Sequence, residues 1–270
     1  MSTFHVYAGA DGSSANYAVR RIETGDLYDC LRAGYEDFLA KPSHVVFIIV
    51  LYPLIGVVLA AWTAGANALP MLFPLASGFA LLGPFAAIGL YEISRRREQG
   101  EAPSWRDALS LRHSPALPAI AVIGGMLFAL FIAWLLVAQS LYVNLFGPHA
   151  PESLGAFFGK VFGTGEGWTL ILFGNAIGAL FALAVLSTTV VAFPLLIDRD
   201  AGALAAIQTS MRAFLINPGP MIAWGFIVAL LLLLGSIPLF AGLIVVLPIL
   251  GHATWHLYRK VVVPAPAARR

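Results

Sequence analysis

Two histidines one helical turn apart are the side chains of this sequence best suited to chemistry. His252 and His256 lie in the segment GHATWHLYRK, at the end of a long apolar run. Their i, i+4 spacing puts both imidazoles on one helix face, where they can serve as two ligands of a metal or a haem. A zinc or copper site needs further ligands, and we predict His44 and His113 at the same membrane rim. An imidazole at a membrane boundary can also bond to headgroups, water or helix ends, or relay protons. No cofactor is therefore assigned, and haem or metal at this pair is kept as an alternative.

Other polar side chains mark candidate functional positions within and beside the apolar runs. Gln139, Asn175 and Thr188 lie inside these runs, where they can bond across helices or line a polar cavity. Asp198 and Arg199 lie at the end of one run, where they serve as capping and salt-bridging residues or as a docking patch. We find no phosphate-binding glycine loop, catalytic serine elbow or paired-cysteine metal site, so no catalytic residue is assigned.

The composition determines the class of protein that must position these residues. Hydrophobic residues make up 59% of the chain and charged residues only 11%, whereas a soluble domain is about 25% charged. A bilayer solvates such an apolar excess directly, which indicates an integral membrane protein. The net charge is only +2, and the basic residues follow the predicted topology, so nothing favours nucleic-acid binding.

The charges leave five uncharged runs long enough to cross about 30 Å of hydrocarbon at about 1.5 Å per residue. These runs cover residues 45–66, 69–91, 117–146, 168–197 and 221–258. The last run is about twice the length of one span, and helix-breaking residues divide it near Gly235, Ser236 and Pro238. The sequence therefore predicts an all-α membrane protein with six transmembrane helices in three hairpins.

The distribution of basic residues predicts the orientation of these spans. Of the sixteen Lys and Arg, only Lys160 lies in a loop on the side opposite to all the others. Positively charged loops are retained in the cytoplasm, so both termini are expected there, with 146–167 as the one sizeable outside loop. The single cysteine, Cys30, then lies on the cytoplasmic side, where we expect it to be a packing residue.

Amphipathic segments before the hairpins indicate an internal repeat. Before span one, the apolar face holds Leu27, Leu31, Tyr35, Phe38 and Leu39. Before span five, it holds Leu204, Ile207, Met211, Phe214 and Leu215. A weaker copy, SWRDALSLRHSPALP, precedes span three. We predict three units, about 22–97, 101–199 and 200–260, each a cytoplasmic interfacial amphipathic helix followed by a hairpin, in a pseudo-threefold parallel repeat. Chance resemblance among apolar segments is the alternative. The tails 1–21 and 261–270 are predicted to be flexible and cytoplasmic.

Several segments resemble a domain-of-unknown-function family of predicted bacterial integral membrane proteins. They are VRRIETGDLYDCLRAGYEDFLAKPS, GPFAAIGLYEISRRREQGEAPSW, FPLLIDRDAGALAAIQTSMRAFLINPGPMIAWG and PLFAGLIVVLPILGHATWHLYRK. The resemblance implies a bacterial inner-membrane location and no established activity. Some members are labelled as cytochrome c oxidase subunits. A haem-copper catalytic subunit needs about six histidines drawn from several membrane helices, and this chain has two in or near its spans, so only an accessory role fits that label.

Three functional hypotheses follow from these residues. The first is a non-enzymatic accessory, assembly or scaffold component, with the lipid bilayer and a membrane-protein partner or a second copy of the chain as partners. The second is a small-molecule or lipid transporter with a polar cavity lined by Gln139, Asn175 or Thr188. The third, which we rank last, is a haem- or metal-binding accessory subunit of a respiratory enzyme, with His252 and His256 as ligands.

Overall fold

The computed structural model describes residues 17–40, 69–81, 83–102, 114–149, 151, 153–199, 201–238 and 241–263. Over these residues the chain is helical, and the one β feature among them is an isolated antiparallel bridge between Val19 and Val262. This confirms the all-helical class. Predicted span one (45–66), His44, His113 and most of the amphipathic segment before span three lie outside the described residues.

Three described segments are long and apolar enough to cross a membrane, by length and composition. They are Leu117–Phe146, Gly165–Asp198 and Pro218–Ser236. The first is helix α8, the second comprises α10 (Gly165–Thr189) and α11 (Ala192–Asp198), and the third is α13. They coincide with predicted spans three, four and five, and most of the α8 and α13 surface is exposed, as expected of helices surrounded by lipid.

The second predicted span, 69–91, is not one continuous helix. The described helices here are α4 (Leu69–Leu81), α5 (Gly83–Ala86) and α6 (Ile88–Glu98), and a turn at Ala87 interrupts the helix between α5 and α6. The region also contains Pro74 and Pro84, which cannot donate a backbone hydrogen bond. The absence of charge over 69–91 therefore predicted an apolar segment correctly, but it did not predict where the helix is interrupted.

The predicted division of the last apolar run is confirmed. Helix α13 ends at Ser236, turns follow, and α14 covers Leu243–Val261. Helix α14 is not among the three segments apolar enough to span, because its second half contains His252, His256, Arg259 and Lys260. That half is enclosed by protein, since most of its side chains are buried.

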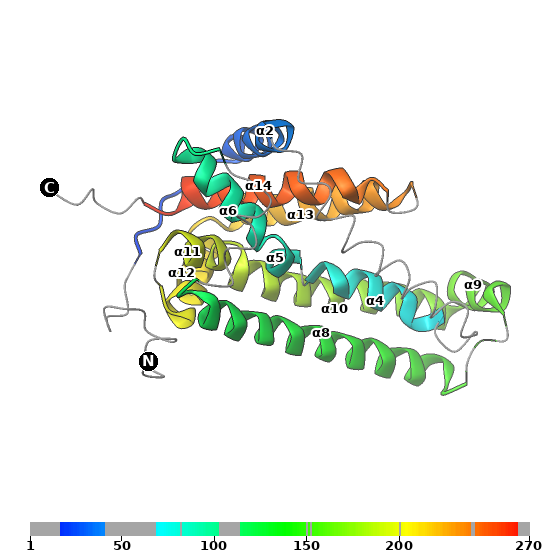
Figure 1. Ribbon diagram of the computed structural model, residues 1–270. Coiled ribbons are helices and arrows are strands. Elements are labelled where there is room, and N and C mark those ends of the chain that lie inside the picture. The colour runs from blue at the N-terminus through cyan, green and yellow to red at the C-terminus, as the bar shows by residue number, and fades with distance from the viewer. Residues whose placement is uncertain are drawn as a thin grey trace, which may run out of the picture. The chain divides into compact units, whose positions relative to one another are not determined.

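One compact unit, made of described parts of 1–48, 84–124 and 186–270, is organised around α14. Helix α14 packs against α2 (Gly25–Ala40), α6, α11 and α13, and α11 in turn contacts α6 and α12 (Ala203–Ile216). Figure 1 shows α14 beside α2, α6 and α13. Because α6, α11 and α14 contact one another pairwise, we call these three helices the central cluster.

The other compact unit, 49–83 with 125–185, contains α4, α9 (Leu154–Gly163) and most of α8 and α10. Trp134 of α8 is its main packing residue: the indole Nε1 donates to the Pro74 carbonyl (2.9 Å), and the ring stacks obliquely against Phe181. The Ser153 hydroxyl caps α9 by accepting from the Ala156 N–H.

Candidate functional site

One buried polar group joins three helices of the unit around α14. Its members are Asp37 of α2, Ser94 and Arg97 of α6, and His252 and His256 of α14. The Ser94 hydroxyl donates to Asp37 Oδ2 (2.6 Å) and lies 2.8 Å from Nδ1 of His252. Nε2 of His256 lies 2.9 Å from the same carboxylate oxygen, and Arg97 donates to the other oxygen, Oδ1. We call these five residues the Asp37 network.

Small residues allow the helices to approach closely enough for these short side chains to meet. A Cβ atom on Gly34 of α2 would lie only 2.5 Å from the backbone nitrogen of Ala253 in α14. A Cβ atom on Gly251 would lie 2.3 Å from a methyl carbon of Leu90 in α6. Glycines at helix contacts bring two backbones together in this way. The Asp37 network therefore lies beside two close contacts of α14, one with α2 and one with α6.

The electrostatics of Asp37 follow from these contacts. Burial alone would raise the pKa of its carboxyl group, since a charged group loses hydration. The hydrogen bonds with His256 and Ser94, together with the nearby imidazoles, outweigh burial and hold the pKa below its ordinary value of 3.8. The carboxylate therefore stays ionised at neutral pH and accepts bonds from two neighbouring helices.

The arrangement of Ser94, His252 and Asp37 differs from that of a nucleophilic triad. In a triad the carboxylate binds the far nitrogen of the imidazole, which leaves the near nitrogen to take the serine proton. Here Asp37 accepts directly from the serine hydroxyl, and Nδ1 of His252 lies 2.8 Å from the same hydroxyl oxygen, so the imidazole does not stand between the serine and the carboxylate. Ser94 is 1% exposed and His252 0% exposed. The group is therefore suited to joining helices and poorly suited to attacking a substrate.

The two histidines do not converge on a common ligand. Nδ1 of His252 faces Ser94, whereas Nε2 of His256 faces Asp37. The part of the chain that the structure describes contains no group of three or more His, Cys, Asp or Glu placed to hold a metal ion. Arg97 already sets a positive charge against Asp37, which disfavours a second cation there. Protein covers most of both imidazoles, because His252 is buried and His256 is largely covered.

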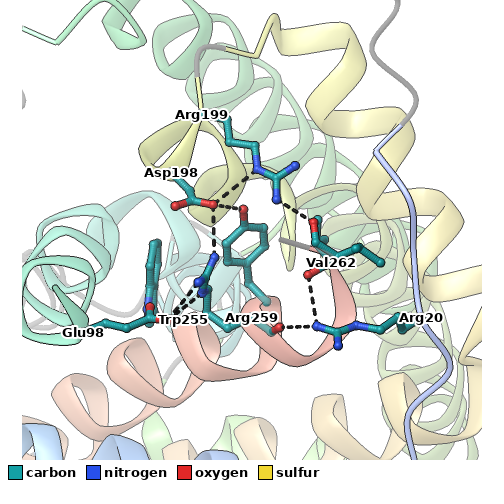
Figure 2. Close-up of polar contacts among 9 residues, drawn as sticks. Arg20, Glu98, Asp198, Arg199, Trp255, Arg259 and Val262 are labelled. Atoms are coloured by element: carbon teal, nitrogen blue, oxygen red, sulfur yellow. Dashed lines mark hydrogen bonds and ion pairs between the residues drawn. The ribbon is translucent and has the colours of Figure 1, made fainter. Parts of the chain in front are cut away.

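A second polar group connects the ends of the central cluster. Arg259 of α14 binds Glu98, the last residue of α6 (2.9 Å), and Asp198, the last residue of α11 (3.4 Å). The Tyr258 hydroxyl donates to Asp198 (2.5 Å), and the Trp255 indole donates to Glu98 (3.2 Å). Figure 2 shows Arg259 between the two carboxylates. We call this group the Arg259 network.

The segment before α2 is anchored to the same end of α14. The Arg20 N–H donates to the Val261 carbonyl (2.7 Å) and the Val263 N–H to the Ala18 carbonyl (3.0 Å). The Arg20 guanidinium also donates to the Arg259 carbonyl (3.1 Å), and Arg199 donates to Val263 (2.6 Å), as Figure 2 shows for the Arg20 and Arg199 side chains. Residues 17–20, within the predicted flexible tail, are therefore held in place.

The sequence-predicted site residues occupy different environments. Asp198 and Arg199 both bond within the protein, Asp198 to Arg199 and Arg259 and Arg199 also to the Val263 carbonyl, as the salt-bridging interpretation expects. Gln139 and Asn175 lie on exposed faces of α8 and α10, and Asn175 donates to the Ile171 carbonyl of its own helix (2.7 Å). Thr188 is half-buried near the end of α10.

Sequence reasoning missed Asp37, Ser94 and Arg97. Asp37 lies in an amphipathic helix among exposed acidic residues, and Arg97 lies in a basic run typical of a membrane boundary. One signal in the sequence was the position of Asp37 on its helix. Asp37 follows Gly34 by three residues and Cys30 by seven, so it lies on the same helix face as these small residues. A carboxylate on a close-packing face needs a partner on the opposing helix.

The lowered pKa of Asp37 predicts how stability depends on pH. A carboxyl group whose pKa is lower in the folded state stabilises that state above its unfolded pKa, and this contribution is lost as the pH falls through the folded pKa. We expect the difference in unfolding free energy between the wild type and Asp37→Asn to be constant from pH 7 to about pH 5 and to shrink below about pH 4. Denaturant titrations in detergent at each pH measure this difference. A difference that stays constant down to pH 3 would contradict the assignment.

The comparisons with known proteins agree with the membrane composition. No curated protein and no solved structure was found to match the chain. Residues 72–198, which include α8, α9, α10 and α11, match the model of the family described as "Predicted integral membrane protein (DUF2189)". The chain is thus a predicted integral membrane protein with a DUF2189 match over residues 72–198.

Proposed function

We propose that this chain is a non-enzymatic accessory, assembly or scaffold component of the bacterial inner membrane. In this proposal it has six spans in three units, about 22–97, 101–199 and 200–260, and both termini are cytoplasmic. The observation that carries the proposal is the Asp37 network, because it uses the chemically capable side chains of the chain to join α2, α6 and α14 to one another.

The side chains of the Asp37 network are engaged in bonds between helices. A catalytic or ligand-binding group needs access to its substrate and a polar atom left over to contact it. Ser94 and His252 are buried, and both bond within the Asp37 network. Among the described residues, no buried side-chain nitrogen or oxygen lacks a hydrogen-bond partner. Such a network stabilises one arrangement of helices, which is the property a scaffold needs.

The spans supply the surface for lipid and for a partner. Large apolar side chains of α13, including Phe226, Leu230 and Leu233, are more than half exposed. Membrane helices associate with one another by packing such surfaces. The charge distribution favours cytoplasmic termini, because the basic residues Arg95, Arg199 and Arg259 all follow or end apolar helices on the side opposite to Lys160.

A pair of substitutions separates a structural role of the histidines from a chemical one. In His252→Asn, the side-chain amide replaces the Nδ1 atom of the imidazole. In His256→Gln, the side-chain amide replaces the Nε2 atom. Both bonds of the Asp37 network can then form, but the variant cannot ligate haem or carry a proton as an imidazole does. We expect the double variant to retain, within about twofold, the proteins that co-purify with the wild type after crosslinking in native membranes.

The controls make this experiment decisive. An unrelated six-span membrane protein carrying the same tag defines the background of captured proteins. Reduced-minus-oxidised absorbance and metal analysis are measured on the same purified samples. A stoichiometric haem or metal signal in the wild type that the double variant lacks would overturn the proposal, as would the absence of any partner above background. Retained partners without a cofactor signal would support it.

A further inference from the structure

Helices α2 and α12 bury the same positions along their length. On α2 the buried residues are Leu27, Cys30, Gly34 and Asp37. On α12 the buried residues Ala203, Ala206, Ser210 and Ala213 have the same spacings, and Ala205 and Thr209 are buried as well. Most members of both sets are small, and Cys30 is inert because burial raises its thiol pKa to about 12. Each helix therefore packs through a small-residue face.

The two helices also dock on equivalent partners. Helix α2 packs on α14, and α12 packs on α11. Both α11 and α14 belong to the central cluster, in which they contact each other and α6. In the predicted repeat, the two described amphipathic helices thus pack against the end of a neighbouring unit: α12 on α11, and α2 of the first unit on α14 of the last.

Large apolar side chains face outward from both helices in the same register. They are Tyr28, Tyr35 and Leu39 on α2, and Leu204, Met211 and Leu215 on α12, all between 44% and 72% exposed. In each helix the spacing is i, i+7, i+11, which places the three side chains in one row along the helix. We call these the outer rows. Leaving such rows in water would cost free energy in proportion to their apolar area.

We infer that the outer rows of α2 and α12 are two equivalent contacts with the lipid bilayer at its polar interface. The row of α12 is continuous in sequence with a lipid-facing helix, since only Asn217 separates α12 from α13. Helix α13 is apolar enough to span a membrane and exposes Ile222 and Phe226 within its first turns. Tyrosines such as Tyr28 and Tyr35 are enriched at the interface, where the ring is buried and the hydroxyl meets headgroups.

The charges beside the rows favour lipid over a protein partner. Beside the row of α2, Glu36 is paired with Arg32 and Asp29 with Lys260, whereas α12 carries Arg212 at the position equivalent to Glu36. A protein partner that recognised the polar side chains beside one row would meet different ones beside the other. Hydrocarbon contacts only the apolar row, which the two helices share. The inference concerns membrane contact and does not depend on the proposed scaffold role.

The test measures what touches the outer rows. In a Cys30→Ala background, a nitroxide spin label is attached at Tyr28→Cys and Leu204→Cys, with Tyr35→Cys and Met211→Cys as a second pair. The labelled proteins are reconstituted in phosphatidylcholine–phosphatidylglycerol vesicles. Collision rates are then compared for oxygen, which concentrates in lipid, and for a nickel chelate, which stays in water. Glu36→Cys is the matched control, one residue from the row of α2.

We expect oxygen collisions to exceed nickel collisions severalfold at all four row positions, with similar values on the two helices, and the reverse at residue 36. Nickel collisions that dominate at the row positions would overturn the inference in favour of water. Low collision rates with both reagents would also overturn it, because protein would then cover the rows. Only samples that elute as the wild type does in size-exclusion chromatography are compared, and the second pair replaces a first-pair variant that fails to fold.

Discussion

Replacing Asp37 by alanine is expected to destabilise the folded protein by about 2–4 kcal/mol. Removing one partner of a buried charge pair typically costs about 3–5 kcal/mol, because the other partner is left without its counter-charge. The value is lower here because Arg97 and His256 keep part of their surface in water. This range includes the lost acceptor of the buried Ser94 hydroxyl, for which about 1–3 kcal/mol is typical. Equilibrium unfolding in detergent, followed by circular dichroism, measures the loss.

The adjacent residue provides a matched control for this prediction. Glu36 has the same charge and helix and pairs with Arg32 at 3.0 Å, but both side chains are more than half exposed. Exposed pairs of this kind contribute about 0.3–0.5 kcal/mol. Glu36→Ala is therefore expected to change stability by no more than about 0.5 kcal/mol. Equal losses for Asp37→Ala and Glu36→Ala would show that the Asp37 network does not hold the three helices together.

The sequence predicted well those features that depend on the average polarity of long segments. The run 117–146 coincides with α8, and the break near Gly235 and Pro238 coincides with the end of α13. Long apolar runs are reliable because a bilayer imposes both their length and their composition. Span two was less predictable, since the turn at Ala87 between α5 and α6 interrupts the helix while the polarity of the run stays unchanged.

The amphipathic helices show that polarity alone does not identify the face that packs on protein. Their large apolar residues, such as Tyr35 and Leu215, indicated the face that contacts a membrane, and the structure leaves both exposed on the protein. The face that packs on other helices holds Gly34 or Ser210, which a hydrophobicity pattern scores as weak. Helix contacts in membrane proteins depend on close approach as much as on apolar area. A pattern of small residues was therefore the better predictor of protein contact.

The candidate site could be predicted only in part, for a related reason. His252 and His256 were found because their spacing is a local feature of one helix. Their partners Asp37 and Ser94 lie far away along the chain and meet the histidines only when three helices pack. No local pattern specifies which helix faces which. The alternative inferred from the pair alone, metal or haem ligation, was therefore weighed without these contacts, which the sequence does not show.

Replacing Gly34 by alanine is expected to destabilise the protein by about 2 kcal/mol, although alanine is the better helix former. The added Cβ would lie 2.5 Å from the backbone nitrogen and 2.7 Å from the Cβ of Ala253, and a backbone cannot move aside as a side-chain end can. Overpacking of this kind costs about 1–3 kcal/mol. Gly25→Ala, in the same helix, is the control, because nothing lies within 4 Å of its added Cβ. We expect Gly25→Ala to be neutral or slightly stabilising.

The double variant Gly34→Ala with Asp37→Ala tests whether both residues act through the same helix contact. If the added methyl group pushes α2 away from α14, it lengthens the bonds of Asp37 to Ser94 and His256, so part of the Asp37 contribution is already lost. We therefore expect the double variant to lose less stability than the sum of the single variants, by about 0.5–3 kcal/mol, as is usual for residues in one network. Equilibrium unfolding of all four proteins completes this cycle. Strict additivity would mean that close approach at Gly34 and charge pairing at Asp37 stabilise α2 independently, and that the glycine does not position the network.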